Sequence, residues 1–179
     1  EIPAAPISGR TDYGAAWTGS DLFVWGGLEQ SNDGNSHASA TGALFSPSRN
    51  TWKIVADAPL SPRSGPSLLP IGSRVVVWGG VDPLDGSYLA DGAIYDPAAD
   101  TWTAMPALPL QDIQAADVIG SSTDLYVVVE APTPSLFHLG EGKDNWARED
   151  DPPAFPAVDL SRATWTGNGF VWLLYPRSG

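Results

Sequence analysis

The 179-residue sequence contains no cysteine and little positive charge. Without cysteine the chain has no disulfide, no thiol nucleophile and no thiolate metal site. Nine lysines and arginines stand against 21 acidic residues, for a formal net charge of −12 at pH 7. Nucleic acids and anionic membranes bind clustered positive charge, so this balance argues against both as partners. Cationic and neutral partners remain open.

Long apolar runs and helical periodicity are also absent. No segment is apolar over the length needed to insert across a bilayer, and none keeps the period of an amphipathic helix. The sequence starts at Glu1 without a signal-peptide pattern, so we expect a mature, trimmed or excised piece. Eight tryptophans, two lysines and no cysteine favour an extracellular or periplasmic location and do not exclude the cytoplasm.

What the chain does contain is an internal repeat. Residues 22–27 (LFVWGG) return as residues 75–80 (VVVWGG), and residues 45–52 (FSPSRNTW) return as residues 95–102 (YDPAADTW). The two offsets, 53 and 50 residues, agree closely. A unit of roughly 50 residues with short apolar strands, a glycine pair and an aromatic-to-tryptophan pair is typical of a four-stranded propeller blade.

A degraded third copy and the start of a fourth continue the pattern. Residues 124–129 (DLYVVV) match residues 21–25, while the glycine pair is lost and replaced near Val129, Glu130 and Ala131. We therefore expect an all-β fold of antiparallel four-stranded blades. The expected blades are residues 10–60, 61–110, 111–156 and, in part, 157–179, with residues 1–9 as the tail of a preceding blade.

The strands of the first unit can be placed in the sequence. We expect strands at residues 13–17, 22–25, 42–46 and 51–55, and a polar loop after the second strand. A type I turn is expected at residues 47–50, with its proline in a favoured place. Helix should be nearly absent.

The glycine pair after an apolar strand, followed by an aromatic residue and a tryptophan, resembles the kelch repeat. The resemblance is strong over residues 10–109 and weaker beyond, and it implies a β-propeller. Three blades and two strands do not close a ring, which needs four to eight blades. We therefore expect a segment of a larger ring of six to eight blades, completed by the remaining blades, a companion chain or a second copy.

The resemblance leaves the activity open, because kelch propellers include protein-binding modules, sugar-handling enzymes and architectural parts. The copper site and cysteine-linked tyrosine radical of the sugar-oxidising members have no counterpart in a cysteine-free segment with two histidines. No histidine has metal-ligand spacing, and no acidic loop fits a calcium pattern. We expect no cofactor and no metal.

Loops on one face of a propeller, near its channel, usually carry function. These are the loops from second to third strand, here residues 28–41, 81–91 and 130–135, and the connections between blades. They are either solvated loops or contact loops for a partner. The candidate contact residues in the first two loops are Asn32, Asp33, His37, Asp82 and Asp85.

Arg10 and Arg63 are 53 residues apart and precede equivalent innermost strands. They either hold a carboxylate or acidic peptide at the channel mouth, or they are structural arginines bonded to carbonyls of the neighbouring blade. The third blade offers Gln111 or Asp112 at this position, so a complete arginine ring is not supported.

Two carboxylates are candidate catalytic residues. Asp117 lies in the expected innermost strand of the third blade, where burial would raise its pKa and suit it to acid-base chemistry. The alternative is that it lines a water-filled channel. Glu130, in the slot of the lost glycine pair, is a second carboxylate on the loop face. Neither has an identifiable partner.

The repeated glycines and tryptophans are interpreted as scaffold. Glycine permits dihedrals that a side chain forbids, and periodic tryptophans favour packing between blades over sugar stacking. The scaffold positions are Gly26, Gly27, Gly79, Gly80, Trp52, Trp102 and Trp146. The sequence thus favours a non-catalytic binding or assembly module for a protein or carbohydrate ligand. The alternative is part of a sugar-active enzyme, of mutarotase or glycan hydrolase type.

Overall fold

The computed structural model describes residues 1–30, 35–110, 113, 115–121, 123–131, 135–140, 143–149, 159–165 and 170–175. For residues 115, 117, 130, 131, 159–165 and 170–175 it describes the backbone alone. The described residues form strands, turns and loops, with no helix. The described residues therefore contain no helix that is long enough and apolar enough to cross a membrane.

Three four-stranded antiparallel sheets follow one another along the chain. Blade 1 contains β2 (Gly14–Trp17), β3 (Leu22–Trp25), β6 (Gly42–Ser46) and β7 (Thr51–Ile54). Blade 2 contains β8 (Ser67–Ile71), β9 (Arg74–Trp78), β10 (Gly92–Asp96) and β11 (Thr101–Ala104). Blade 3 contains β12 (Ala115–Gly120), β13 (Asp124–Ala131), β14 (Ser135–Gly140) and β15 (Ala147–Arg148). A fourth sheet pairs β16 (Asp159–Trp165) with β17 (Phe170–Tyr175).

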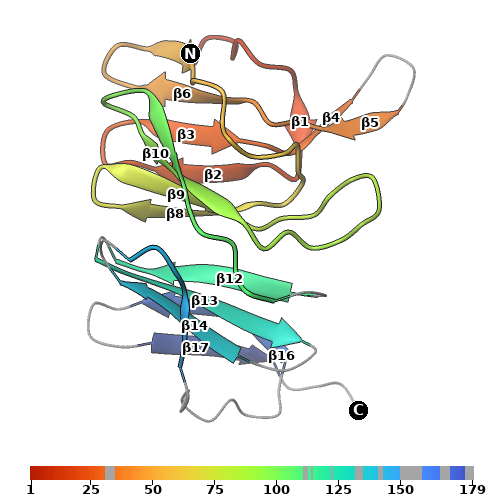
Figure 1. Ribbon diagram of the computed structural model, residues 1–179. Coiled ribbons are helices and arrows are strands. Elements are labelled where there is room, and N and C mark those ends of the chain that lie inside the picture. The colour runs from red at the N-terminus through yellow and green to blue at the C-terminus, as the bar shows by residue number, and fades with distance from the viewer. Residues whose placement is uncertain are drawn as a thin grey trace.

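The sheets are stacked face to face in chain order (Figure 1). The first strands of successive sheets are neighbours, since β2 contacts β8, β8 contacts β12 and β12 contacts β16. They are therefore the innermost strands of a β-propeller, and the predicted all-β propeller architecture is confirmed.

The segment after β3 differs from the expected polar loop. Its ends form a hairpin of β4 (Leu28–Gln30) and β5 (Ser36–Ala38), and β4 also pairs with β1 (Arg10–Thr11). The hairpin projects beyond the main sheet (Figure 1). The polar composition of these residues hid the strands, because their side chains are not packed on an apolar face.

The turns between third and fourth strands also differ in detail from the prediction. The amide of Asn50 donates to the carbonyl of Pro47 at 3.3 Å, which makes Pro47 the first residue of the turn rather than the favoured second one. Asn50 and Asp100, at the last turn position in blades 1 and 2, have φ angles of 52° and 55°. Asn and Asp tolerate this left-handed conformation better than other side chains do.

The core lies between the blades. In β9, Val75 and Val77 pack into the cluster shared with blade 1, whereas Val76 and Trp78 pack into the cluster shared with blade 3. All four are at most 1% exposed. A strand that is buried on both faces needs a continuous apolar run, which explains the sequence VVVW.

The side of blade 1 that faces away from blade 2 is less covered. Three large apolar side chains on this side are well exposed: Ile2 at 68%, Trp17 at 50% and Ile54 at 56%. Ile2 precedes Pro3, whose carbonyl accepts from Trp52, and Val55 precedes Ala56, whose carbonyl accepts from Trp102. The two positions are therefore equivalent, but Val55 is only 5% exposed. The equivalent position is thus buried wherever a blade lies on both sides of it.

Candidate binding face

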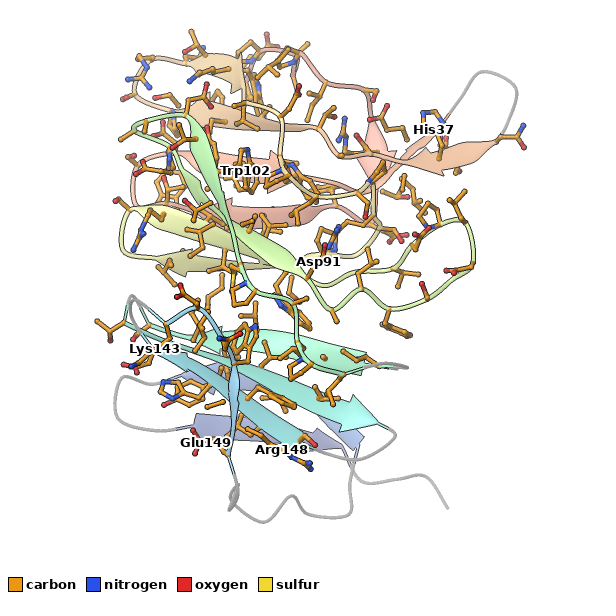
Figure 2. The ribbon with its side chains drawn as sticks, viewed as in Figure 1. His37, Asp91, Trp102, Lys143, Arg148 and Glu149 are labelled. Carbon is orange, nitrogen blue, oxygen red and sulfur yellow. The ribbon has the colours of Figure 1, made fainter. Side chains whose placement is uncertain are left out.

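The loops after the second strands and the connection from blade 1 to blade 2 lie on one face, called here the loop face. The amide of Gly27 donates to the carbonyl of Arg63 at 2.9 Å, and the amide of Arg63 donates to the carbonyl of Ser39 at 3.2 Å. These bonds join the connection to the loop of blade 1. Figure 2 shows His37 and Asp91 on this side of the molecule and Lys143 on the opposite side.

Arg63 is completely buried at the base of the loop face. Its Nη1 donates to the carbonyl of Gly79 at 3.0 Å and to Oδ1 of Asp91 at 2.7 Å, and its Nη2 donates to Oδ2 of Asp91 at 3.3 Å. Nε and Nη2 also donate to the carbonyl and hydroxyl of Ser61. A guanidinium has five N–H donors, and all five are used inside the protein.

Arg10 repeats this arrangement in blade 1. Its Nη1 donates to the carbonyl of Gly26 at 3.1 Å, and its Nη2 donates to Oε1 of Glu29 at 2.9 Å. Burial lowers the pKa of Arg10, and the charge of Glu29 partly opposes that shift. Further donors reach Ser8, Ser39 and Thr41.

The contacts of both arginines are those of the structural alternative. Each guanidinium donates to the carbonyl of the first glycine of a glycine pair, and so ties that pair to the segment that leads into the blade. Each also donates to a carboxylate of the protein itself. Neither offers a free pair of donors to a ligand. In blade 3 the residue four positions before Asp117, which corresponds to Arg63 before Ser67, is Ile113 rather than Gln111 or Asp112. Ile113 is buried in the apolar cluster between blades 2 and 3.

The glycine pairs have the positive φ angles that the sequence suggested. Gly79 and Gly80 have φ angles of 66° and 97°, and Gly26 and Gly27 have 71° and 95°. A Cβ on Gly80 would also lie 2.7 Å from the carbonyl oxygen of Ser64. These positions are constrained by the backbone, so they bear on the shape of the loop face rather than on ligand chemistry.

The repeated tryptophans connect blades 1, 2 and 3 each to the chain segment that leads into the blade. Trp102 lies against Phe23, Trp25 and Tyr95, with ring centroids 4.9 to 6.1 Å apart. One indole N–H donates to a backbone carbonyl in each of blades 1, 2 and 3: Trp52 to Pro3, Trp102 to Ala56 and Trp146 to Pro106. These are packing contacts between blades.

The loop between β9 and β10 is shaped by two of the predicted contact residues. Oδ1 of Asp82 accepts from the amide of Leu84 at 2.8 Å, and Oδ1 of Asp85 accepts from the amide of Ser87 at 2.8 Å. Hydrogen bonds from Ser87 lower the pKa of Asp85. Both carboxylates therefore stabilise turns within the loop.

Large apolar side chains stand out on the same face. Leu84 is 92% exposed and Tyr88 48%, both in the loop after β9, and Tyr13, beside Gly27, is 49% exposed. The side chain of His37 on β5 is 61% exposed, and its Nε2 lies 3.9 Å from Glu29. Asn32 and Asp33 lie outside the described residues.

The two carboxylate candidates lie close in register at the loop end of blade 3. Asp117 on β12 pairs with Val128 on β13. The pairing shifts between Ala115 and Ala116, which leaves Glu130 as the extra residue of a bulge. The strand continues here because residues 129 and 130 are not glycines that turn the backbone away. Among the described residues, no group of three or more His, Cys, Asp or Glu side chains could hold a metal ion.

A polar cluster in blade 3 was not recognised in the sequence. Nε2 of His138 lies 2.9 Å from Oδ1 of Asp124, and Nδ1 lies 3.6 Å from Oε1 of Glu149. The imidazole stacks on Tyr126 at 4.6 Å. His138 therefore has two acidic neighbours and one aromatic neighbour. The pairing of Tyr126 with His138 across two strands, not any local motif, brings the groups together.

Known proteins were compared with this chain. The family model for the Kelch motif matches residues 62–109. A Kelch-like protein, terF, of Aspergillus terreus is 28% identical over 104 residues, which are 56% of this chain and 22% of that protein. An F-box/kelch-repeat protein of Arabidopsis thaliana is 32% identical over 128 residues, which are 72% of this chain and 29% of that protein.

A solved structure of a protein named YjhT matches the fold with a TM-score of 0.71 at 15% identity, covering 96% of this chain and 60% of that one. The chain spans less than a third of the length of each of the two curated relatives, the Aspergillus and the Arabidopsis protein. The matched motif covers blade 2, whose glycine pair and aromatic-to-tryptophan pair recur in blade 1. The chain therefore belongs to the kelch-repeat β-propeller family.

Proposed function

We propose that this chain is a non-catalytic kelch binding module that recognises a protein or carbohydrate through its loop face. The observation that carries the proposal is the exposure of Leu84, Tyr88 and Tyr13 on that face. Exposed large apolar residues on a soluble scaffold mark interaction surfaces, and tyrosine is enriched at protein interfaces. Kelch repeats are generally protein-binding modules, which supports the same conclusion.

The scaffold beneath this face is rigid, which favours recognition. Arg10 and Arg63 each hold a glycine carbonyl and a carboxylate. The loops that they anchor begin from fixed positions, so less conformational entropy is lost when a partner binds. The arginines act in this proposal by positioning the loops, and the exposed loop residues make the contacts.

A second part of the proposal concerns the open side of blade 1. Ile2, Trp17 and Ile54 lie on the side of blade 1 that no described sheet covers, whereas blades 2 and 3 each have a sheet on both sides. We propose that another blade covers this side in a closed ring, supplied by the same polypeptide or by a companion chain. Light scattering tests this: the protein with its ring closed should be monodisperse, whereas the 179-residue segment alone should associate.

The binding proposal is tested by the double variant Leu84→Ser with Tyr88→Ser. Immobilised wild-type protein is screened against a glycan array and by cross-linking to proteins, and whatever it binds is then titrated against the variant. Binding should fall by at least about tenfold, since exposed aromatic and aliphatic anchors dominate interfaces. Arg49→Gln, on the opposite face, is the matched control and should bind normally. Normal binding by the double variant would place the site elsewhere.

A sugar-active enzyme is the second candidate. It is favoured by one observation: Asp117 and Glu130 lie near each other in register at the loop end of blade 3, beside a bulge. Bulges often lie next to active sites. Turnover assays on the sugars of the array separate the candidates. Turnover that is lost in Asp117→Asn would contradict the non-catalytic proposal.

A further inference from the structure

The face opposite the loops carries a groove between blades 2 and 3, called here the turn-face groove. It encloses about 490 Å³. The aliphatic part of its lining comes from both blades: Ile71, Ile94, Met105, Leu125 and Leu139. No described lining residue is aromatic. Because sugars usually stack on aromatic rings, this floor fits an aliphatic side chain better than a sugar.

The corresponding groove between blades 1 and 2 is smaller, about 250 Å³. Asp100 bridges the two blades there. Its Oδ2 accepts from Nζ of Lys53 at 2.7 Å, and its Oδ1 accepts from the hydroxyl of Tyr95 at 2.6 Å and from the amide of Ala56 at 3.0 Å. Three donors on two blades are thus joined through one carboxylate.

Between blades 2 and 3 all three donors are lost. The residues at the positions of Lys53, Tyr95 and Ala56 are Thr103, Leu139 and Pro106. Thr103 is short, Leu139 has no hydroxyl and Pro106 has no amide hydrogen. Asp144, at the position of Asp100, also lines the groove, is exposed and has no partner among the described residues. The groove is therefore open, because the bridge that crosses its counterpart cannot form.

Two cations line this groove, and neither has an acceptor among the residues that the structure describes. Arg74 and Lys143 both line it and are both exposed. Every other lysine or arginine whose side chain is described contacts a carboxylate or a hydroxyl: Arg10, Arg49, Lys53, Arg63 and Arg148. In a chain of net charge −12, the free positive charges of the described part meet at one groove.

We propose that the turn-face groove binds an extended acidic peptide segment of a partner protein. A carboxylate of the peptide lies between Arg74 and Lys143, and a neighbouring aliphatic side chain lies on the apolar floor. The floor removes apolar surface from water, and the two cations supply charge-assisted hydrogen bonds that a neutral peptide cannot accept. This site is separate from the loop face and does not depend on it.

The probe is a fluorescein-labelled Gly-Leu-Glu-Leu-Gly peptide with blocked ends, followed by fluorescence anisotropy with the protein. A second peptide with Gln in place of Glu tests the charge requirement. The double variant Arg74→Gln with Lys143→Gln should bind the acidic peptide about tenfold more weakly or worse, a loss of about 1.4 kcal/mol or more. Both side chains are exposed and have no partner in the described part of the chain, so the variant should fold normally.

Arg49→Gln is the matched control, because it removes one exposed cation from the same face at the neighbouring groove. It should leave the affinity unchanged. Thr103→Lys places a lysine opposite Asp144, as Lys53 lies opposite Asp100, and should weaken binding by occupying the groove.

Four outcomes would overturn the proposal. They are no binding by the wild-type protein, equal binding of the Gln peptide, an equal loss in Arg49→Gln, and binding of free glucuronate in place of the peptide. The last would assign the same cations to an acidic sugar. Loss of binding in the loop-face double variant would be a fifth such outcome, because it would show that the peptide binds the loop face. The two proposals therefore fail separately.

Discussion

In blade 2, Arg63 joins the carbonyl of Gly79 to the carboxylate of Asp91, whereas in blade 3 the corresponding position is Ile113. The two residues that accept hydrogen bonds from Arg63 in blade 2 are also replaced in blade 3. Val129 stands at the position of Gly79 and Ser135 at that of Asp91. The arginine, the glycine and the acid thus form one unit. Where the unit is lost, β13 runs on to Ala131 instead of turning away.

A second unit differs between the same two blades. Trp78 pairs with Gly92 across β9 and β10, and Val128 pairs with Leu136 across β13 and β14. A Cβ on Gly92 would lie 2.6 Å from Cδ1 of Trp78. Blade 2 thus pairs a large residue with a glycine, whereas blade 3 pairs two residues of intermediate size at the same positions. Close packing demands this, because a filled core tolerates a change in volume only when a neighbour compensates.

The largest effect is expected when the arginine unit of blade 2 is broken. Arg63→Ile should lower the free energy of unfolding by about 3 to 5 kcal/mol, since the hydrogen bonds of a fully buried guanidinium are lost and the carbonyl of Gly79 is left without its donor. Urea denaturation measures the loss. Arg63→Ile with Asp91→Ser, which introduces the residue types of blade 3, should recover part of it. A single variant as stable as the wild type would contradict the scaffold role of Arg63.

The exchanged pair gives the next effect. Gly92→Leu should cost about 3 kcal/mol, because the side chain is forced against Trp78 and overpacking carries penalties of this size. Adding Trp78→Val should relieve about 1 kcal/mol or more of that cost, the coupling typical of residues in contact. Thermal unfolding of both single variants and the double variant measures the coupling. Strictly additive losses would mean that the two positions are not one packing unit.

The glycine pair should show a graded effect. Gly79→Ala should cost about 1 kcal/mol, from its positive φ angle alone. Gly80→Ala should cost about 2 kcal/mol, because its new Cβ also meets the carbonyl of Ser64. Each variant is the other's control in the same thermal unfolding experiment. An equal cost at both positions would mean that the close approach to Ser64 relaxes easily.

The strands were largely predictable, because apolar runs, glycine pairs and proline-containing turns are local signals. β3 and β6 have the predicted bounds. The hairpin of β4 and β5 was missed because the residues of β5, Ser36–Ala38, show no apolar alternation and gain their order from pairing with β4.

The site was less predictable, because recurrence shows that a residue matters without showing its partner. Arg63 takes its carboxylate from Asp91, 28 residues on, and Arg10 takes its own from Glu29, 19 residues on. These acids occupy different positions in the repeat, so alignment of the copies could not have paired them. The neighbours of His138 were hidden for the same reason, since they meet only across strands.

The smallest effect concerns Asp100, which bridges blades 1 and 2, and Asp144, which bridges nothing among the described residues. Burial alone would raise the pKa of Asp100, but hydrogen bonds from Lys53, Tyr95 and the amide of Ala56 outweigh it and hold the pKa at about 2. An unfolded aspartate has a pKa of about 3.9. The carboxylate therefore stabilises the fold above pH 4, and this contribution is lost as the pH falls through 2.

Asp100→Asn should therefore cost on the order of 1 kcal/mol at pH 6, a figure kept small by partial exposure to solvent. The difference from the wild type should shrink as the pH falls from 4 toward 2, because the wild-type carboxylate then becomes protonated. Urea denaturation at several pH values measures it, with Asp144→Asn as the matched variant that should leave stability nearly unchanged. A difference that stays constant between pH 6 and pH 2 would mean that the bridge does not depend on the charge of Asp100. An equal loss in Asp144→Asn would mean that the junction between blades 2 and 3 is bridged after all, and that the turn-face groove is narrower than its lining indicates.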